Sequence, residues 1–315
     1  MLCLFSPPNF GMRLKWLLVA YVLFNVFYAT AFFVHPPLGA WALAASGRGP
    51  EGLGSQGLDA YTRRFSQHEI ERRILAQSRF VLRDASGLQL METPKGKFWE
   101  PATEGTAIVA QLAEQEAKYT GFERPIHPGD IVLDCGANVG SFTRLAVDQG
   151  AAIVVAIEPA PENVACLRRT FAAEIAAGKV IVYPKGVWDK DDFLTLSVSD
   201  KTSAMDSFVI QTDTHTGVTV PLTTIDKLVL ELKLPRVDFI KMDIEGAEQR
   251  ALAGGANAIG AWRPRMEISV NHLPDDPRMV PLVIRRIQPD YRIECLESEV
   301  HRKDLRLEAE ILYFH

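Results

Sequence analysis

The sequence predicts an α/β fold with a doubly wound, mostly parallel sheet, preceded by one transmembrane helix. From residue 126 onward, short apolar runs alternate with amphipathic segments, which is typical of parallel strands joined by helices. Closer to the amino terminus, residues 16–34 form an apolar run without a single charge. About 20 such residues are needed to span the hydrocarbon core of a bilayer as a helix.

Residues 1–45 are therefore predicted to be a membrane anchor or a signal segment. At 1.5 Å rise per residue, the run 16–34 spans about 28 Å, close to the thickness of the hydrocarbon core. Secretory signals have shorter apolar regions of about 7 to 15 residues, which favours a retained anchor. Two other interpretations stay open. The stretch AWALAAS at 40–46 has the small residues of a cleavage site, and the run also suits a buried core helix.

Residues 46–125 are predicted to be a linker and an N-terminal extension. Gly and Ser are frequent in residues 46–58, as in flexible linkers. Charged and apolar residues alternate at helical spacing in 61–80, and again in 108–122. Between these two predicted helices, residues 80–100 contain turn residues between apolar runs, which predicts a small strand pair.

Residues 126–315 are predicted to form the working domain. Its predicted strands are 131–135, 152–158, one within 179–188, 237–244 and 264–270, and its predicted helices include 141–150, 161–178 and 248–259. Ligands of such sheets bind at the carboxyl ends of the strands.

The charge and the cysteines of this domain exclude two classes of protein. Residues 126–315 hold 21 basic and 28 acidic side chains, whereas a nucleic-acid-binding domain normally carries a basic surface. No nucleic-acid partner is therefore expected. The four cysteines are too widely separated for a zinc motif or a disulfide scaffold, so buried free thiols are expected at Cys3, Cys135, Cys166 and Cys295.

The segment VLDCGANVGSFTRLAVDQGAAIVVAIEP, residues 132–159, has the pattern of a nucleotide-binding strand–loop–helix–strand unit. The dinucleotide fingerprint G-x-G-x-x-G would require glycine at two further positions, where Asn138 and Ser141 stand. NAD is therefore disfavoured. The sequence D-x-G here consists of Asp134 at the strand end and Gly136, and a second glycine, Gly140, follows four residues later. This pattern suits a sulfonium cosubstrate, which has an amino-acid portion and a ribose but no pyrophosphate.

Each end of this segment receives a predicted role. Asp134 is expected near the charged methionyl portion, directly or through water, and Gly136 to allow close approach of the backbone. Glu158 is expected to accept hydrogen bonds from both ribose hydroxyls. The alternative is that both acids only cap the helices that follow. The complete predicted cosubstrate set is Asp134, Gly136, Ala137, Asn138, Gly140, Glu158, Trp188 and Asp189, with the last two beside the adenine unless Trp188 is a core residue.

Five segments together resemble the FkbM family of S-adenosylmethionine-dependent methyltransferases. They are DCGANVGSFTR, EPAPENVACLRR, TTIDKL, VDFIKMDIEGAEQRAL and RPRMEISVNHLPDD, within residues 90–315. The resemblance implies a Rossmann-like class I methyltransferase sheet, S-adenosylmethionine as cosubstrate, and methyl transfer to a hydroxyl of a sugar, a glycan or a secondary metabolite. A non-catalytic binding or scaffold module and an NAD-dependent oxidoreductase are the alternatives.

Three residues at predicted strand ends are candidates for catalysis. Asp243 and Glu245 alternate along one face at the end of the strand 237–244, and His272 follows the next strand. Asp243 is the first candidate for a base or an orienting group, and His272 could deprotonate an alcohol near neutral pH. Glu245 and Glu248 could instead cap the next helix. The three candidates could together bind a divalent cation, but no HExxH-type spacing supports it, so no metal site is predicted.

The anchor and the cosubstrate together predict a place in the cell. S-adenosylmethionine is a cytoplasmic metabolite, so a single-pass protein with a cytoplasmic catalytic domain is expected, although Arg13 and Lys15 favour the opposite orientation. The acceptor is then expected to be a small molecule, a sugar or a lipid-linked glycan met at the membrane to which residues 16–34 attach the chain.

Overall fold

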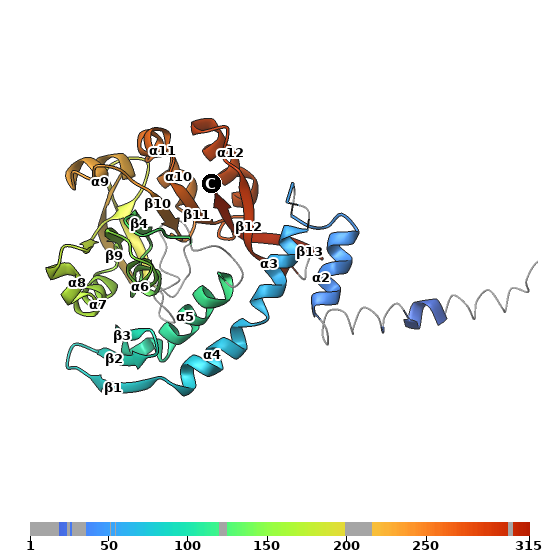
Figure 1. Cartoon of the computed structure of the whole chain (residues 1–315), viewed down its shortest axis with the longest axis horizontal. Helices are drawn as coiled ribbons and strands as arrows, with labels where there is room; N and C mark the ends of the chain where they lie inside the picture. The colour runs from blue at the N-terminus through green and yellow to red at the C-terminus, as the bar shows by residue number, and fades with distance from the viewer. Residues whose placement is uncertain are drawn as a thin grey trace, which may run out of the picture.

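The computed structural model describes residues 19–23, 26, 36–50, 52–53, 55–119, 125–198, 216–301 and 305–315 (Figure 1). The predicted membrane helix at 16–34 lies mostly outside these ranges. Among the described residues, no helix combines the length and the apolar character that crossing a bilayer requires. The anchor therefore stays a prediction.

A seven-stranded sheet forms the centre of the protein, with the strand order β12-β13-β11-β10-β4-β5-β6. Five adjacent strands of this sheet run parallel to one another, in the order β11-β10-β4-β5-β6. The strand β13 is antiparallel to both of its neighbours, β11 and β12. Their bounds are β4 Ile131–Cys135, β5 Ile153–Ile157, β6 Val180–Tyr183, β10 Phe239–Met242, β11 Arg265–Ser269, β12 Ile293–His301 and β13 Arg306–Phe314. The mostly parallel α/β sheet is confirmed. The antiparallel hairpin β12–β13 at its edge was not predicted.

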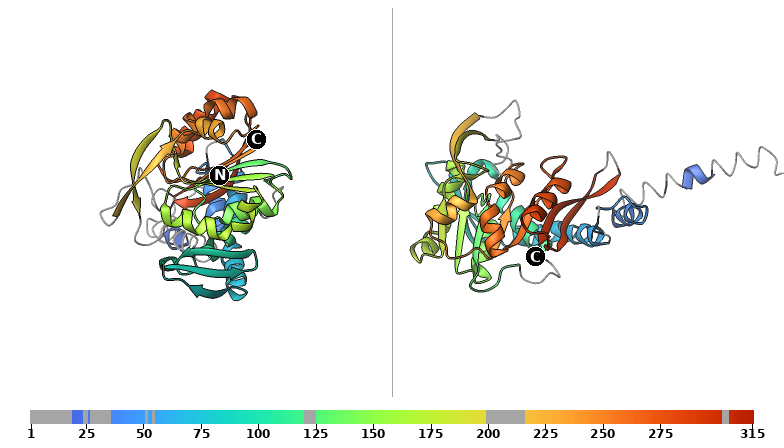
Figure 2. Two further views of the ribbon diagram at one scale, coloured as in Figure 1. Left: turned by 90° about the vertical axis from the view of Figure 1, so that its left-hand side faces the viewer. Right: turned by 90° about the horizontal axis from the view of Figure 1, so that it is seen from above.

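Helices cover both faces of this sheet because each strand carries apolar side chains on both sides (Figures 1 and 2). Leu133 of β4 belongs to a buried cluster with residues of α9 (Ile225–Glu231), α10 (Glu248–Ala253), α11 (Ala256–Trp262) and α12 (Asp276–Ile287). Its neighbour Val132 belongs to a second cluster, with residues of α6 (Ser141–Asp148) and α7 (Pro161–Thr170). Because both faces of the sheet are buried, the sequences of its central strands are continuous apolar runs.

Two predicted helices are interrupted in the structure. The segment 161–178 divides at Phe171 into α7 and α8 (Ala172–Ala176). The segment 248–259 divides into α10 and α11 at Gly254 and Gly255, where a Cβ on Gly254 would lie 2.0 Å from the backbone oxygen of Trp188. The interruption thus lets a neighbouring loop pass close to the helix axis.

The N-terminal extension contains more elements than predicted. One amphipathic helix was expected at 61–80, and the structure has α3 (Gln56–Arg64) and α4 (Gln67–Ala76). The expected strand pair is a three-stranded antiparallel sheet. The remaining elements of the extension are α2 (Pro36–Ala45), β1 (Arg79–Arg83), β2 (Leu88–Thr93), β3 (Gly96–Pro101), the 3₁₀ helix η2 (Ala102–Glu104) and α5 (Ala107–Lys118).

A further small sheet lies outside the extension. It contains β7 (Gly186–Val187), β8 (Asp192–Val198) and β9 (Thr216–Thr223).

The extension packs directly against the central domain. The Ser298 hydroxyl of β12 donates a hydrogen bond of 2.5 Å to the Gly57 carbonyl of α3. The backbone amide of Trp99 in β3 donates to the Thr170 hydroxyl at the end of α7. Residues 56–118 therefore help to shape the sites of the central domain.

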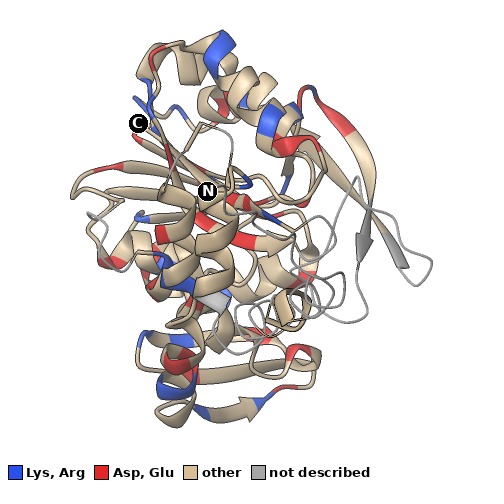
Figure 3. Cartoon of the chain, turned by 90° about the vertical axis from the view of Figure 1, so that its right-hand side faces the viewer, with Lys and Arg blue, Asp and Glu red and all other residues tan. Residues whose placement is uncertain are grey.

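Charge and thiols follow the expectations where the structure describes them. Figure 3 shows basic and acidic positions interspersed over the described elements. Cys135, Cys166 and Cys295 are buried free thiols, as predicted. Cys3 lies outside the described residues.

Candidate functional site

One cavity of about 500 Å³ opens at the carboxyl ends of β4, β5, β10 and β11. This volume lies within the roughly 300–1,000 Å³ of small-molecule sites. Residues that directly follow each of these strands line it, including Gly136 after β4, Glu158 after β5, Asp243 after β10 and His272 after β11. The cavity therefore lies at the carboxyl ends of the strands, where the sequence predicted the site.

Asp134 lies beneath this cavity instead of lining it. Its side chain is completely buried, and its Oδ2 accepts a 2.6 Å hydrogen bond from the Thr143 hydroxyl. Its Oδ1 lies 3.6 Å from the Lys241 Nζ, which itself donates to the Gly136 carbonyl at 2.8 Å. Burial raises the pKa of Asp134, while Lys241 and Thr143 oppose that shift. A direct contact with a methionyl portion does not fit this position, whereas the predicted contact through water stays a prediction. Asp134 also lies beside Lys241, which donates to the loop.

The two glycines of the loop are required by packing of the protein on itself. A Cβ on Gly136 would lie 1.9 Å from the backbone oxygen of Asp243, and a Cβ on Gly140 would lie 2.3 Å from the Phe171 ring. Both residues also have positive φ, 77° and 99°. The close approach of the Asp243 backbone is thus a further reason for glycine at position 136, and the predicted approach of backbone to ligand stays a prediction.

Glu158 lines the cavity and joins two loops. Its Oε2 accepts from the amide of Asn138 at 2.8 Å, and its Oε1 accepts from the amide of Ala160 at 2.9 Å. Only 5% of this residue is exposed. A carboxylate accepts hydrogen bonds and Glu158 lines the cavity, so its position suits a diol that donates to it. Ala137 and Asn138 line the same part of the cavity, so these residues fit a ribose-bearing cosubstrate.

Trp188 and Asp189 do not line the cavity, although Gly186 and Val187 do. Trp188 is buried in a small cluster with Leu222 and Ala247, and the Arg250 guanidinium lies 5.0 Å from the centre of its ring. Arg250 also donates to Asp189 at 2.7 Å. The structure therefore favours the alternative of a core tryptophan, and the predicted adenine contact of both residues does not fit their position.

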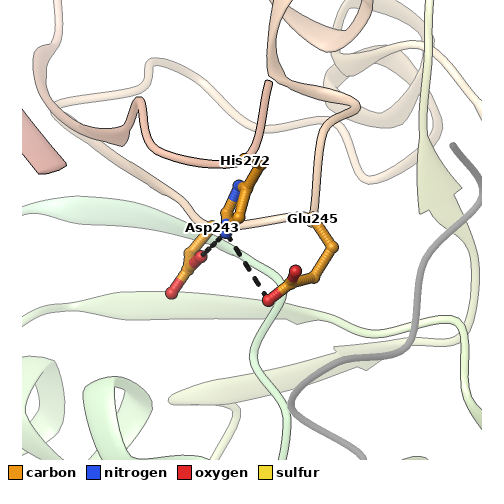
Figure 4. A group of neighbouring side chains, drawn as sticks. All are labelled: Asp243, Glu245 and His272. Atoms are coloured by element: carbon orange, nitrogen blue, oxygen red, sulfur yellow. Dashed lines mark ion pairs between the residues drawn. The ribbon is translucent and has the colours of Figure 1, made fainter. Parts of the chain in front are cut away.

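Asp243, Glu245 and His272 meet in the cavity as the sequence suggested (Figure 4). The His272 Nε2 lies 3.4 Å from an oxygen of Asp243 and 3.5 Å from an oxygen of Glu245. Asp243 is 41% exposed, Glu245 24% and His272 11%, so the carboxylates open towards the cavity. One edge of the imidazole thus faces two carboxylates beside the loop that contains Gly136.

Glu248 is the member of this site whose role the sequence did not reveal. Its carboxylate is completely buried, accepts from the amides of Ile244 and Gly246, and lies 2.8 Å from the Nδ1 of His272. It therefore caps the loop before α10, as considered for this position, and in addition fixes the orientation of the imidazole. The spacing in sequence gave no signal for this contact, because His272 follows a different strand.

The electrostatics of the group set its protonation in the ligand-free chain. Burial lowers the pKa of His272, but the hydrogen bond that the imidazole donates to Glu248 and the nearby carboxylates raise it to about 9. Burial raises the pKa of Glu245 to about 7. For Asp243, burial raises the pKa, but Lys241 and His272 lower it below its ordinary value. In the ligand-free chain the imidazole is therefore mainly cationic at neutral pH, and its predicted use as a base requires that this proton leave first.

The far end of the cavity is lined by residues of the N-terminal helices and of the edge hairpin. Arg64 of α3 forms ion pairs with Glu310 and, at 3.3 Å, with Glu299. The buried Oε1 atoms of Gln111 and Gln115 in α5 have no hydrogen-bond partner among the described residues. This end is polar, and the sequence did not predict it, because α3 and α5 lie in the predicted extension and the hairpin β12–β13 was not predicted. The lining residues of this end are Arg64, Gln111, Glu114, Gln115, Glu297, Glu299, Glu310 and Ile311.

Comparison with known sequences gives a family for the segment that builds most of this site. The model of the methyltransferase FkbM domain matches residues 134–293. The 31-O-demethyl-FK506 methyltransferase FkbM of Streptomyces tacrolimicus is 26% identical over 161 residues, which cover 42% of this chain and 62% of that protein. The match thus spans less than two thirds of that relative.

Solved structures with a similar arrangement include methyltransferases. The methyltransferase FkbM from Methylobacillus flagellatus KT is 22% identical, with a TM-score of 0.46 over 66% of this chain and 53% of that chain. The O-methyltransferase from Bacillus cereus, solved with SAH, is 14% identical, with a TM-score of 0.36 over 68% of this chain and 83% of that chain.

Proposed function

Because the chain belongs to the FkbM family of methyltransferases, we propose that it transfers the methyl group of S-adenosylmethionine to a hydroxyl oxygen of a polar acceptor. The observation that carries this proposal is a single cavity that combines two kinds of group. Glu158 offers hydrogen-bond acceptors to a ribose, and Asp243, Glu245 and His272 gather beside it.

The chemistry needs alignment and the loss of one proton. The acceptor oxygen forms a bond to the methyl carbon, the carbon–sulfur bond breaks, and its electron pair returns to sulfur. Holding donor and acceptor in line supplies much of the acceleration. The hydroxyl proton must also leave, and the carboxylates of Asp243 and Glu245 lie where they orient the hydroxyl and favour that loss.

The far end of the cavity supports a polar acceptor such as a sugar, a glycan or a hydroxylated secondary metabolite. The side chains of Gln111 and Gln115 line this end, and so do the carboxylates of Glu297 and Glu299; amides and carboxylates both accept hydrogen bonds. Hydroxyl groups are the donors that such a surface satisfies. The name of the relative from Streptomyces tacrolimicus, a 31-O-demethyl-FK506 methyltransferase, also supports oxygen as the methylated atom.

A membrane position is a further part of the proposal. The apolar run 16–34 suits a retained anchor, and the need for S-adenosylmethionine places the catalytic domain on the cytoplasmic side. A lipid-linked glycan at the membrane surface is then an acceptor that an anchored enzyme would meet.

The test is a calorimetric titration of the full-length protein with S-adenosylmethionine. We expect saturable binding, weakened at least about tenfold by Glu158→Gln, because the loss of one charge-assisted hydrogen bond to a buried carboxylate costs about 1.5 to 3 kcal/mol. The matched control is Glu162→Gln, which removes the same charge from an exposed position in the first turn of α7.

The result also separates the alternatives. Binding that Glu162→Gln leaves intact and Glu158→Gln weakens supports the methyltransferase site. A folded wild-type protein that does not bind S-adenosylmethionine would contradict the proposal and favour a non-catalytic binding module. Binding of NAD in its place would favour the oxidoreductase.

A further inference from the structure

We propose that Asp243, Glu245 and His272 form a binding site for one divalent transition-metal ion, which holds the acceptor hydroxyl during methyl transfer. The inference rests on the proposed function and extends it to the way the acceptor is held. The sequence alone predicted no metal site, because the three residues do not follow a ligand spacing along the chain.

The first argument is the separation of the candidate ligand atoms. One oxygen of each carboxylate and one ring nitrogen of His272 lie within 4.8 Å of one another. The nitrogen lies 3.4 Å and 3.5 Å from the two oxygens. Two atoms that each bind one ion at about 2.1 Å, at tetrahedral or octahedral angles, are separated by about 3.0 to 3.4 Å. The nitrogen–oxygen spacings are therefore close to those of a coordination sphere, and an ion would draw the two carboxylate oxygens, which lie within 4.8 Å of each other, to a similar spacing.

The second argument is the contrast between the two ring nitrogens of His272. The Nδ1 makes a hydrogen bond of normal length, 2.8 Å, to the buried Glu248. The contacts of the Nε2 are longer than a normal hydrogen bond. A carboxylate that fixes one nitrogen so that the other can bind a metal is the usual arrangement around metal-ligating histidines. Because Glu248 is also held by the amides of Ile244 and Gly246, the ring orientation is set before an ion arrives.

The third argument is the place of the group. All three side chains line the cavity, and the two carboxylates, which lie beside the imidazole in Figure 4, are more exposed than the ring. An ion held by three protein ligands keeps positions for an acceptor oxygen, and such an ion lowers the pKa of a bound hydroxyl. The proton of that hydroxyl then leaves to solvent while its oxygen forms the bond to the methyl carbon. A nitrogen and two carboxylate oxygens suit Mn²⁺ or Zn²⁺ better than Mg²⁺ or Ca²⁺.

The test is a titration of the full-length protein with Mn²⁺, in which electron paramagnetic resonance measures the free ion. We expect saturable binding of about one Mn²⁺ per chain, with competition by Zn²⁺. Asp243→Asn, Glu245→Gln and His272→Gln should each weaken binding at least about tenfold, as loss of a ligand does. Glu299→Gln is the matched control, since it removes one negative charge from the same cavity outside the group.

Titration of the same samples with S-adenosylmethionine separates this inference from the proposed function. A protein that binds S-adenosylmethionine but not Mn²⁺ or Zn²⁺ overturns the ion site and leaves the methyltransferase proposal standing. Binding of Mn²⁺ that is equal in the wild type and in the three variants overturns the site as well. Failure to bind S-adenosylmethionine counts against the proposed function itself.

Discussion

Gly136 lies where the ends of β4 and β10 approach each other most closely. Its amide donates to the carbonyl of Ile157, and the amide of Asp243 donates to the carbonyl of Cys135. These hydrogen bonds hold the backbone oxygen of Asp243 against the position that a side chain would occupy. The glycine thus fixes the place of Asp243 as well as the path of the loop.

We expect Gly136→Ala to destabilise the protein by about 2 to 5 kcal/mol. The new Cβ would lie 1.9 Å from the backbone oxygen of Asp243, and the residue has a φ of 77°. Positive φ costs about 1 to 2 kcal/mol for an L-residue, and overpacking costs about 1 to 3 kcal/mol more. Urea unfolding followed by circular dichroism measures the change.

The control for this substitution is Gly178→Ala. Gly178 has a similar φ of 71°, but a Cβ there has no atom within 4 Å. It should cost only about 1 kcal/mol, the strain of the backbone alone. Equal losses in the two variants would show that the close approach of Asp243 contributes nothing.

The sequence predicted which residues gather in the cavity, but not which contacts their side chains make there. The strand-end rule brought Glu158, Asp243, Glu245 and His272 to one cavity. It placed Asp134 there too, although Thr143 and Lys241 keep that side chain buried. Contacts between side chains of different strands depend on packing, which sequence spacing does not contain.

Among the elements, α5 is joined to the sheet by a buried ion pair. The Lys118 Nζ donates to the Glu267 carboxylate of β11 at 2.9 Å, and the Tyr119 hydroxyl donates to the same carboxylate. Lys118 and Glu267 are only 3% and 2% exposed. This contact fixes the helix that carries Gln111 and Gln115 into the cavity.

Lys118→Met should destabilise the protein by about 3 to 5 kcal/mol, because Glu267 would stay buried without its cation. The double variant Lys118→Met, Glu267→Met should recover at least half of this loss, since an apolar pair leaves no buried charge. Thermal unfolding of the wild type and of both variants gives the comparison.

Lys227→Met provides the matched control. Lys227 pairs with Asp191, but these side chains are 48% and 51% exposed, so the loss should stay below about 1 kcal/mol. A double variant no more stable than Lys118→Met would contradict the assignment of the loss to an unpaired charge.

The elements with strong periodicity were the ones that the sequence predicted. The apolar strands β4, β5, β10 and β11 appear close to their expected bounds. The helix breaks at Phe171 and Gly254 were missed, because they arise from packing against neighbouring segments. The hairpin β12–β13 was also missed, since its charged residues hide the apolar pattern of a strand.

The predicted anchor would place the whole catalytic domain on one side of the membrane, and a labelling experiment can test which side this is. In a Cys3→Ser background, Ser46→Cys places a single new thiol in the linker that precedes α3, while Cys135, Cys166 and Cys295 are buried. We expect a membrane-impermeant thiol reagent to label this residue only after the cells are permeabilised. Labelling in intact cells would place the domain outside the cytoplasm and contradict the proposal.

The two ends of the cavity come from different parts of the chain. Residues that match the FkbM family, 134–293, supply the loop, Glu158 and the group around His272. Every lining residue of the far end lies outside that range, on α3, α5, β12 and β13. Under the proposed function, changes in these flanking segments alter which acceptor fits, but Gln111 also donates to the Asn138 side chain of the loop at 3.2 Å. An engineer who grafts flanking segments from one homologue to another should therefore keep Gln111.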